Sequence, residues 1–247
     1  VIIETDISDE IKKQLPNIKF FSLDKNKDLH SPKVRDLAGD TIAYLLFTSG
    51  STGQPKGVPI SHDNLNSYLK NIEKRIKFRK KLKFSQVFPL TFDLSIHDIF
   101  VCWKYAGILT PVPEKQMLSP AKFIKEKKIE VWFSVPSQIS LLHQVGLLKK
   151  NMFPSIKISM FCGEALTLDG VQKWIKAAKN SEVYNLYGPT EATIAITSYK
   201  LPSNKNNIKS KYGIVSIGKI FKNHEIKIIK NELILKGPQV TKKYWNN

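Results

Sequence analysis

The sequence predicts an α/β protein with a parallel central sheet and a small β subdomain at its C-terminal end. Between residues 108 and 186, short apolar runs typical of strands alternate with amphipathic stretches typical of helices, which is the pattern of βαβ units. A loop rich in glycine and hydroxyl groups, residues 48–57, directly follows an apolar strand. After residue 200 the pattern changes to two short strands around a tight turn. We therefore assign residues 1–200 to the α/β part and 201–247 to the β subdomain.

Composition indicates a globular protein. With 247 residues, of which 42% are hydrophobic, the chain can bury a substantial core. It has no apolar run of about 18 residues and no signal-like start, so we expect a cytoplasmic protein that does not enter membranes. Cys102 and Cys162 are far apart and lack metal-ligand spacing. This argues against disulfides and zinc.

The chain is strongly basic, with a formal charge of +18 from 39 Lys and Arg against 21 Asp and Glu. Such a balance is compatible with a nucleic-acid or acidic-protein partner. However, the positive residues are scattered, and the one dense cluster, residues 74–83, is predicted to be the end of a helix and a solvated linker. We therefore expect no nucleic-acid partner. An acidic carrier protein would also suit a basic surface.

The first third of the chain contains the expected surroundings of the glycine-rich loop. Before the loop, the pattern predicts an extended start, a helix, a strand, a linker and a buried strand at residues 1–8, 9–15, 18–23, 28–40 and 41–47. After it, residues 58–60 form a short return strand. Ser61 is expected to be the N-cap of a helix that ends near Ile76.

The rest of the chain continues the alternation. We expect strands at 84–89, 108–112, 131–135, 156–161 and 182–186, and helices at 120–127, 137–148 and 168–178. Ser95 is predicted to cap a further helix, whose apolar positions run from Ile96 to Trp103. Asp93 and His97 are four residues apart, so they can face the same way. Strands 225–229 and 232–236 flank a Lys-Asn turn and predict a hairpin.

The glycine-rich loop, from Thr48 to Gly57, reads Thr-Ser-Gly-Ser-Thr-Gly-Gln-Pro-Lys-Gly. Its glycines allow a tight backbone, and its hydroxyls, N–H groups and Lys56 can face one polyphosphate. It is not a Walker A loop, because Lys56 follows a proline and precedes Gly57 rather than opening a helix. The alternative is an ordinary Gly/Ser turn.

Two segments carry a resemblance to a known family. Residues 48–57 resemble the phosphate-loop motif of the adenylate-forming, or AMP-binding, superfamily, and residues 185–191, Asn-Leu-Tyr-Gly-Pro-Thr-Glu, resemble its second motif in the same order. Residues 161–166 and 187–196 are most similar to D-alanyl carrier protein ligases and to amino-acid adenylation domains of nonribosomal peptide synthetases. The resemblance implies a fragment of the family's layered α/β N-terminal domain. The family's own start and its C-terminal lid domain are expected to be absent.

The resemblance also implies ATP and Mg²⁺ as ligands. It assigns catalytic roles to Lys56, Thr190 and Glu191, with Glu191 as the metal ligand. Taken alone, the turn at 163–165 would be an ordinary strand end. The implied ATP-binding residues are Thr48, Ser49, Gly50, Ser51, Thr52, Gly53, Lys56, Gly163, Glu164, Ala165, Asn185, Tyr187, Gly188 and Thr190.

The substrate pocket is assigned in the same way. Asp93 would pair with the α-ammonium of an amino acid, whereas the alternative is a helix N-cap. Cys162 has the alternative of a small core residue and His97 that of a satisfied structural histidine, while Ser134 depends on a register that can slip by one. The implied substrate-binding residues are Asp93, Leu94, His97, Ser134, Met160, Cys162, Leu186, Ile194 and Ala195.

Together these residues predict ATP-dependent activation of a small amino acid as aminoacyl-AMP. In the full-length enzyme the aminoacyl group would pass to a phosphopantetheinyl carrier protein, and this fragment alone is expected to be nearly inactive. One alternative is a ligase for another carboxylic acid, such as an aryl, fatty or hydroxy acid, for which Asp93 is the discriminating residue. The other is a non-catalytic module that binds a nucleotide or docks a carrier.

Overall fold

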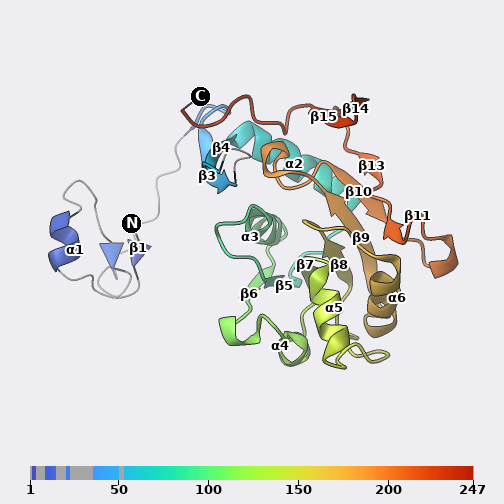
Figure 1. Ribbon diagram of the computed structural model, residues 1–247. Coiled ribbons are helices and arrows are strands. Elements are labelled where there is room, and N and C mark those ends of the chain that lie inside the picture. Colours follow the sequence, from blue (N-terminus) through green and yellow to red (C-terminus); the bar gives the residue numbers. More distant parts are fainter. Residues whose placement is uncertain (1, 4–8, 15–20, 23–35, 50–52, 247) are drawn as a thin grey trace. The chain divides into compact units, whose positions relative to one another are not determined.

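The computed structural model describes residues 2–3, 9–14, 21–22, 36–49 and 53–246, and the chain divides between Leu37 and Ala38 into two compact units (Figure 1). In the smaller unit, β1 (Ile2–Ile3) pairs in parallel with β2 (Phe21–Ser22), and α1 (Asp9–Gln14) lies between them in sequence. The predicted order of strand, helix and strand is therefore confirmed. Most of the predicted linker, residues 28–35, lies outside the described residues.

The larger unit holds the predicted α/β pattern (Figure 1). Its helices are α2 (His62–Arg75), α3 (Leu94–Lys104), α4 (Ala121–Lys127), α5 (Ser137–Gln144) and α6 (Leu168–Ala177), with short 3₁₀ turns η1 (Glu114–Gln116), η2 (Thr190–Ala192) and η3 (Lys205–Asn207). Its strands are β3 (Ile42–Thr48), β4 (Lys56–Ser61), β5 (Lys83–Gln86), β6 (Ile108–Pro111), β7 (Val131–Ser134), β8 (Ile158–Phe161), β9 (Glu182–Tyr187), β10 (Thr197–Lys200), β11 (Ser210–Lys211), β12 (Ile214–Val215), β13 (Lys219–Ile220), β14 (Glu225–Ile229) and β15 (Glu232–Lys236).

A seven-stranded sheet forms the centre of this unit, in the order β13-β10-β9-β8-β7-β5-β6. From β6 to β9 all neighbouring strands are parallel, and β10 and β13 add antiparallel strands at one edge. The predicted parallel sheet is confirmed. Since β13 follows residue 200, the C-terminal region contributes a strand to this sheet, and the division at residue 200 stays a prediction. The β14–β15 hairpin has the predicted ends, with both turn residues at positive φ.

Helices cover both faces of the sheet, which gives two apolar clusters. One cluster joins side chains of α2 and α3 to Phe133 and Met160 of the sheet. The other joins side chains of α4, α5 and α6 to Trp132 and Phe161. Adjacent strand residues thus point to opposite faces, as a pleated strand requires. Because β7 and β8 are buried on both sides, their sequences are almost continuously apolar.

The strand before the glycine-rich loop differs from the prediction. We expected a buried strand, but β3 pairs only with β4 in a separate antiparallel hairpin. Since β3 lies outside the central sheet, it is only partly covered, and the side chains of Ile42 and Phe47 are 41% and 60% exposed. The glycine-rich loop is therefore the tip of a hairpin rather than the end of a central strand.

Two helix starts test the predicted caps. The prediction for Ser61 is confirmed, since its hydroxyl accepts the Asn64 N–H at 3.2 Å and Asn64 Oδ1 accepts the Ser61 N–H at 3.0 Å. The prediction for Ser95 is wrong. Helix α3 begins at Leu94 with Asp93 in the N-cap position. The Ser95 hydroxyl instead donates to the Phe92 carbonyl oxygen at 2.7 Å, so it bonds backward to the chain before the helix.

Two further expectations need correction. Helix α5 ends at Gln144, short of residue 148, where Gly146 takes a positive φ of 72°. The basic segment at 74–83 is not a fully solvated linker. Its apolar residues Ile76, Phe78 and Leu82 are buried in the cluster under α2 and α3, while its lysines are mostly exposed.

Candidate active site

The predicted motifs meet at one edge of the central sheet. Because β5, β7, β8 and β9 are parallel, their carboxyl ends lie on the same side. Asp93 follows β5, the 163–165 turn follows β8, and residues 188–191 follow β9. Ligands of open α/β sheets commonly bind at this edge. The fold thus brings together motifs that are about a hundred residues apart in sequence.

The glycine-rich loop connects β3 to β4, with Thr48 paired to Lys56 across the hairpin. Gly50, Ser51 and Thr52 lie outside the described residues. Ser49 is exposed, and Gly53 has a positive φ of 80° with no atom within 4 Å of the position that a Cβ would occupy. A glycine is therefore favoured there by backbone conformation rather than by crowding.

Residues 241–245 join this loop to the second motif. The Tyr244 hydroxyl donates to Glu191 Oε1 at 2.9 Å, and the Thr241 N–H donates to the Glu191 carbonyl at 2.8 Å. Lys56 Nζ lies 5.2 Å from the centre of the Tyr244 ring, within the range of a cation–π contact. Tyr244 thus contacts two of the three predicted catalytic residues, Lys56 and Glu191. Sequence reasoning assigned Tyr244 no role in the site.

Glu191 carries the carboxylate oxygens that Mg²⁺ prefers as ligands. In the described part of the chain, no three His, Cys, Asp or Glu side chains are grouped closely enough to hold a metal by themselves. Mg²⁺ typically takes one or two carboxylates together with substrate phosphates and water. A single carboxylate beside a phosphate-loop lysine therefore fits a metal that arrives with a nucleotide.

The predicted adenine-facing residues are held by the fold. Asn185 is buried, and its Nδ2 donates to the Ser216 carbonyl at 3.1 Å, while Oδ1 has no partner among the described residues. Glu164 accepts from the N–H and hydroxyl of Ser137 at 2.8 and 3.0 Å, so it fixes the 163–165 turn to the start of α5. Tyr187 ends β9, half-buried.

Gly188 permits a close backbone approach beside these residues. A Cβ at this position would lie 2.6 Å from Ala195 Cα and 2.9 Å from the Ile194 carbonyl oxygen. Both contacts are to backbone, which cannot move aside as a side chain can. The glycine therefore allows the 188–191 motif to pack closely against the backbone of residues 194–196.

Asp93 is buried and faces that segment. Its Oδ2 accepts the Ile194 N–H at 3.2 Å. This bond joins the segment after β5 to the segment after β9, although β7 and β8 lie between these two strands in the sheet. The Asp93 side chain makes no cap bond to α3. Burial raises the pKa of Asp93 to about 6, and the negative charge of Glu191 adds to the increase. Asp93 thus occupies the N-cap position of α3, while its carboxylate accepts the N–H of Ile194, a residue outside the helix.

The backbone opposite Asp93 is strained. Thr193 and Ile194 have φ values of 56° and 70°, which are rare for β-branched residues. Strain of this kind persists only where surrounding contacts impose it, and it is frequent at functional sites. The strained turn directs the Ile194 N–H at the Asp93 carboxylate.

Most of the predicted pocket residues meet in the cluster under α2 and α3. These are Leu94, Met160, Cys162, Leu186, Ile194 and Ala195. Burial raises the pKa of the Cys162 thiol to about 12, so it stays protonated at neutral pH. Cys162 is thus a buried, uncharged member of this apolar cluster, as its core alternative requires, and its place in a substrate pocket stays a prediction.

His97 is fully buried beside the same cluster. Its Nδ1 lies 2.5 Å from the Tyr68 hydroxyl, and its Nε2 has no partner among the described residues. Burial lowers the pKa of His97 to about 3, so the ring is neutral. It is therefore not a fully satisfied structural histidine. Tyr68 was missed from the sequence, where it appears only as one apolar position of α2.

Ser134 is the predicted residue that the fold does not bring into this cluster. Its hydroxyl accepts from Trp132 Nε1 at 3.1 Å, on the opposite face of the sheet. The next residue, Val135, packs against the cluster that holds Met160 and Cys162. Because side chains alternate along the strand, Val135 rather than Ser134 faces the cluster. The register therefore differs by one residue from the predicted one.

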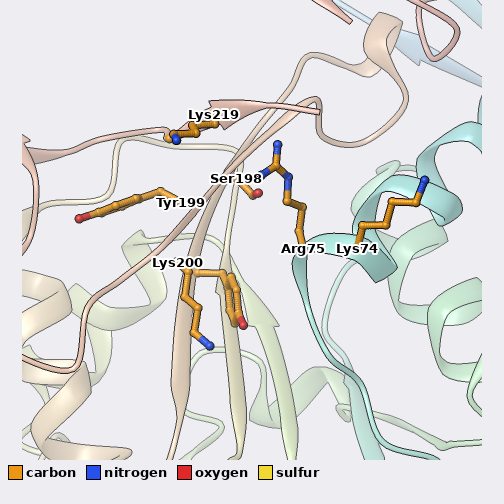
Figure 2. A pocket seen from close by; sticks show the side chains of 8 residues that line it. Lys74, Arg75, Ser198, Tyr199, Lys200 and Lys219 are labelled. Atoms are coloured by element: carbon orange, nitrogen blue, oxygen red, sulfur yellow. The ribbon is translucent and has the colours of Figure 1, made fainter. Parts of the chain in front are cut away.

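Cavities also lie outside this arrangement. One of about 930 Å³ is bordered by Gly237, Pro238, residues 240–246, Pro59 and Asn64. None of the predicted site residues is among its described lining residues. The second, of about 290 Å³, lies between the end of α2 and the sheet edge and is lined by four basic residues, Lys74, Arg75, Lys200 and Lys219 (Figure 2). Size alone therefore does not identify the active site.

The basic cavity uses much of its charge within the fold. Arg75 Nη2 donates to the Ile220 carbonyl at 2.6 Å, which ties α2 to β13, and Lys200 pairs with Glu182 at 2.5 Å. In Figure 2, Arg75 points toward Ser198 while Lys74 extends away from the strands.

Among the helices that the structure describes, none is long and apolar enough to cross a membrane.

The parallel sheet, with the hairpin loop of Lys56 and with Glu191 at its carboxyl edge, has the arrangement of α/β folds that bind a ligand at this edge. The chain belongs to the AMP-binding enzyme family, whose model matches residues 3–245. This membership confirms the resemblance drawn from residues 48–57 and 185–191.

Curated relatives include a D-alanine–D-alanyl carrier protein ligase of Staphylococcus epidermidis, 31% identical over 252 residues that cover 97% of this chain and 50% of the relative. A second is an L-proline–[L-prolyl-carrier protein] ligase of Pseudomonas fluorescens, 34% identical over 175 residues, 69% of this chain and 35% of the relative. This chain thus spans about half the length, or less, of these relatives.

A solved structure resembles the whole chain. The adenylation domain AlmE of Vibrio cholerae, in complex with glycyl-adenosine-5'-phosphate, is 34% identical with a TM-score of 0.83, and the match covers 100% of this chain and 49% of AlmE. The fold class is therefore confirmed as part of the α/β architecture of adenylation domains.

Proposed function

We propose that the full-length protein uses ATP to activate a small amino acid as aminoacyl-AMP and then transfers the aminoacyl group to a phosphopantetheinyl carrier protein. The observation that carries this proposal is Asp93. Its carboxylate is buried, accepts a backbone N–H, and lies under the influence of a negative rather than a positive neighbouring charge. A buried carboxylate of this kind is stabilised when a cationic partner arrives. The α-ammonium of an amino acid supplies that cation.

The reaction joins a carboxylate oxygen of the amino acid to the α-phosphorus of ATP, while the bond from that phosphorus to the pyrophosphate oxygen breaks. Positioning and charge stabilisation supply most of such catalysis. Lys56 and Thr190 would contact the phosphates and Asp93 would orient the ammonium. Glu191 would hold Mg²⁺, which neutralises phosphate charge. Asn185, Tyr187 and the 163–165 turn would border the adenine.

The size of the substrate side chain follows from the pocket walls. Met160 and Leu186 are buried in the same apolar cluster as Ile194, the residue whose N–H Asp93 accepts, and His97 packs against Phe133 of that cluster. These walls support a small side chain. Relatives named for D-alanine and L-proline, and the AlmE complex with a glycyl adenylate, support the same class. The carrier-protein partner rests on the relatives' names. A cytoplasmic location is proposed because ATP is a cytoplasmic substrate.

The test is ATP–pyrophosphate exchange by the full-length protein with glycine, both stereoisomers of alanine, L-proline and L-phenylalanine. Propionate, lactate and benzoate would serve as acids that lack the α-ammonium. We expect exchange with one or more small amino acids and little with phenylalanine or the other acids. Exchange with lactate or benzoate alone would replace the proposal with the other ligase class. Nucleotide binding without any exchange would favour a non-catalytic module.

A further inference from the structure

Gln239 lies completely buried, three residues after β15, although its side chain is polar. Its backbone N–H donates to His224 Nε2 at 3.2 Å, and its carbonyl accepts the Thr193 hydroxyl at 2.5 Å. Its Oε1 accepts from Asn71 Nδ2 of α2 at 3.3 Å. A buried amide with this many partners fixes its surroundings strongly, because each lost bond would leave a polar group unpaired.

The amide nitrogen of Gln239 holds the strained turn. Nε2 lies within hydrogen-bond distance of three carbonyl oxygens, those of Ala192 at 3.2 Å, Thr193 at 3.4 Å and Ala195 at 2.8 Å. Its two hydrogens are therefore shared among three acceptors. All three carbonyls belong to the segment 192–195, which contains the two residues at positive φ.

That segment is also the one that orients Asp93. Ile194 lies between the clamped residues, and its N–H donates to Asp93 Oδ2 at 3.2 Å. Without a clamp, a β-branched residue at a φ of 70° would relax toward an ordinary conformation. Relaxation would turn the Ile194 N–H away from the carboxylate and leave the carboxylate free to rotate.

We infer that Gln239 is a positioning residue for substrate recognition, which holds the 192–195 turn so that Ile194 orients the Asp93 carboxylate toward the substrate ammonium. This inference rests on the proposed function, because it concerns the same pocket. It also gives the segment 237–245 two roles. Thr241 and Tyr244 contact Glu191 on the phosphate side, while Gln239 contacts the amino-acid side.

The test compares Gln239→Leu with the unchanged full-length protein. Leucine keeps much of the volume but cannot donate to the three carbonyls. We expect the amino-acid KM to rise about tenfold or more, while the ATP KM stays within about twofold, because only the ammonium contact is disturbed. The preference for alanine over propionate in pyrophosphate exchange should fall by a similar factor. A purely structural role would lower stability without changing this preference.

Gln138→Leu is a matched control. Gln138 is also buried, but its amide reaches a single carbonyl, that of Leu118 at 3.5 Å, on the other side of the sheet. We expect its alanine-to-propionate preference to remain unchanged. Thr193→Val supplies a second variant of the same shape, which removes the hydroxyl bond to the Gln239 carbonyl. It should shift the preference in the same direction by a smaller factor, and it decides the matter if Gln239→Leu does not fold.

The outcomes separate the inference from the proposed function. If the unchanged protein activates amino acids but Gln239→Leu, or a folded Thr193→Val in its place, keeps the normal KM and preference, the positioning role is wrong. If the unchanged protein activates no amino acid, the proposed function fails instead. A raised KM together with a lost preference supports both.

Discussion

The site has an amino-acid side around Asp93 and a phosphate side around Lys56 and Glu191. The two sides differ in how many of their polar groups already have hydrogen-bond partners. Around Asp93 the side chains are buried, and His97 Nε2 lacks a partner among the described residues. On the phosphate side, Glu191 and Lys56 are only half-buried and both contact Tyr244. Unpaired polar atoms in a dry pocket discriminate strongly between ligands, whereas exposed charges act through weaker, screened contacts. We therefore expect the amino-acid side to be the more sensitive to substitution.

The largest effect should follow from Asp93→Ala in the full-length protein. Losing a charge-assisted contact in a buried pocket costs about 2–5 kcal/mol, so amino-acid KM should rise sharply while ATP KM changes little. Pyrophosphate exchange measured over a range of each substrate separates the two constants. Asp169→Ala is the control, because this acid is exposed and pairs only with Lys173. A normal amino-acid KM in Asp93→Ala would contradict the assignment of the ammonium site.

An intermediate effect is expected on stability in the absence of substrate. The folded pKa of Asp93, about 6, lies above its ordinary value of 3.8. The folded state therefore binds the proton more tightly than the unfolded state, and the stability contribution falls as pH rises from about 4 to about 6. Ionised Asp93 thus destabilises the fold at pH 7, and Asp93→Asn should stabilise it by about 1–3 kcal/mol.

Chemical denaturation at pH 7 and pH 4 measures this difference. The gain from Asp93→Asn should be present at pH 7 and largely absent at pH 4. Glu191→Gln should change the free energy of unfolding by less than about 0.5 kcal/mol at either pH, because Glu191 is only partly buried. Equal gains from both substitutions would remove the contrast between the two halves of the site.

The smallest effect concerns the contact that spans the phosphate side. Tyr244→Phe removes the hydroxyl that donates to Glu191 but keeps the ring beside Lys56. A net hydrogen bond is worth about 0.5–1.5 kcal/mol, so ATP KM should rise by a factor of about 2–10 while amino-acid KM is unchanged. A larger change in amino-acid KM than in ATP KM would show that the halves are coupled through residues 237–245.

The sequence was sufficient for features that depend on local pattern. The parallel strands, the Ser61 cap and the β14–β15 hairpin could be predicted because period, capping chemistry and turn residues lie within a few positions of one another. Motif spacing located Lys56 and Glu191, and the fold brings both to Tyr244.

Features that depend on distant partners could not be predicted. The link between Gln239 and Ala195 spans 44 residues, and no local pattern marks a buried amide as a clamp. Ser134 shows the limit of pattern at one position, because a single step along β7 moves a side chain to the other face. The exposure of β3 follows from its pairing with β4 outside the central sheet. An apolar run in the sequence does not indicate which sheet a strand joins.

The distribution of tryptophan gives the protein a built-in optical reporter. Trp132 and Trp174 are fully buried and stacked with ring centres 6.2 Å apart, on the face of the sheet covered by α4, α5 and α6. Trp245 has a 46% exposed side chain, and its backbone N–H donates to the Gly57 carbonyl at 2.8 Å, at the base of the glycine-rich loop. The buried pair should emit at short wavelength and report the integrity of the core. Trp245 should emit at longer wavelength, and so should Trp103 of α3, which is 64% exposed. In a Trp103→Phe variant, a nucleotide settling on the loop would therefore change the red side of the spectrum and leave the blue side as an internal reference.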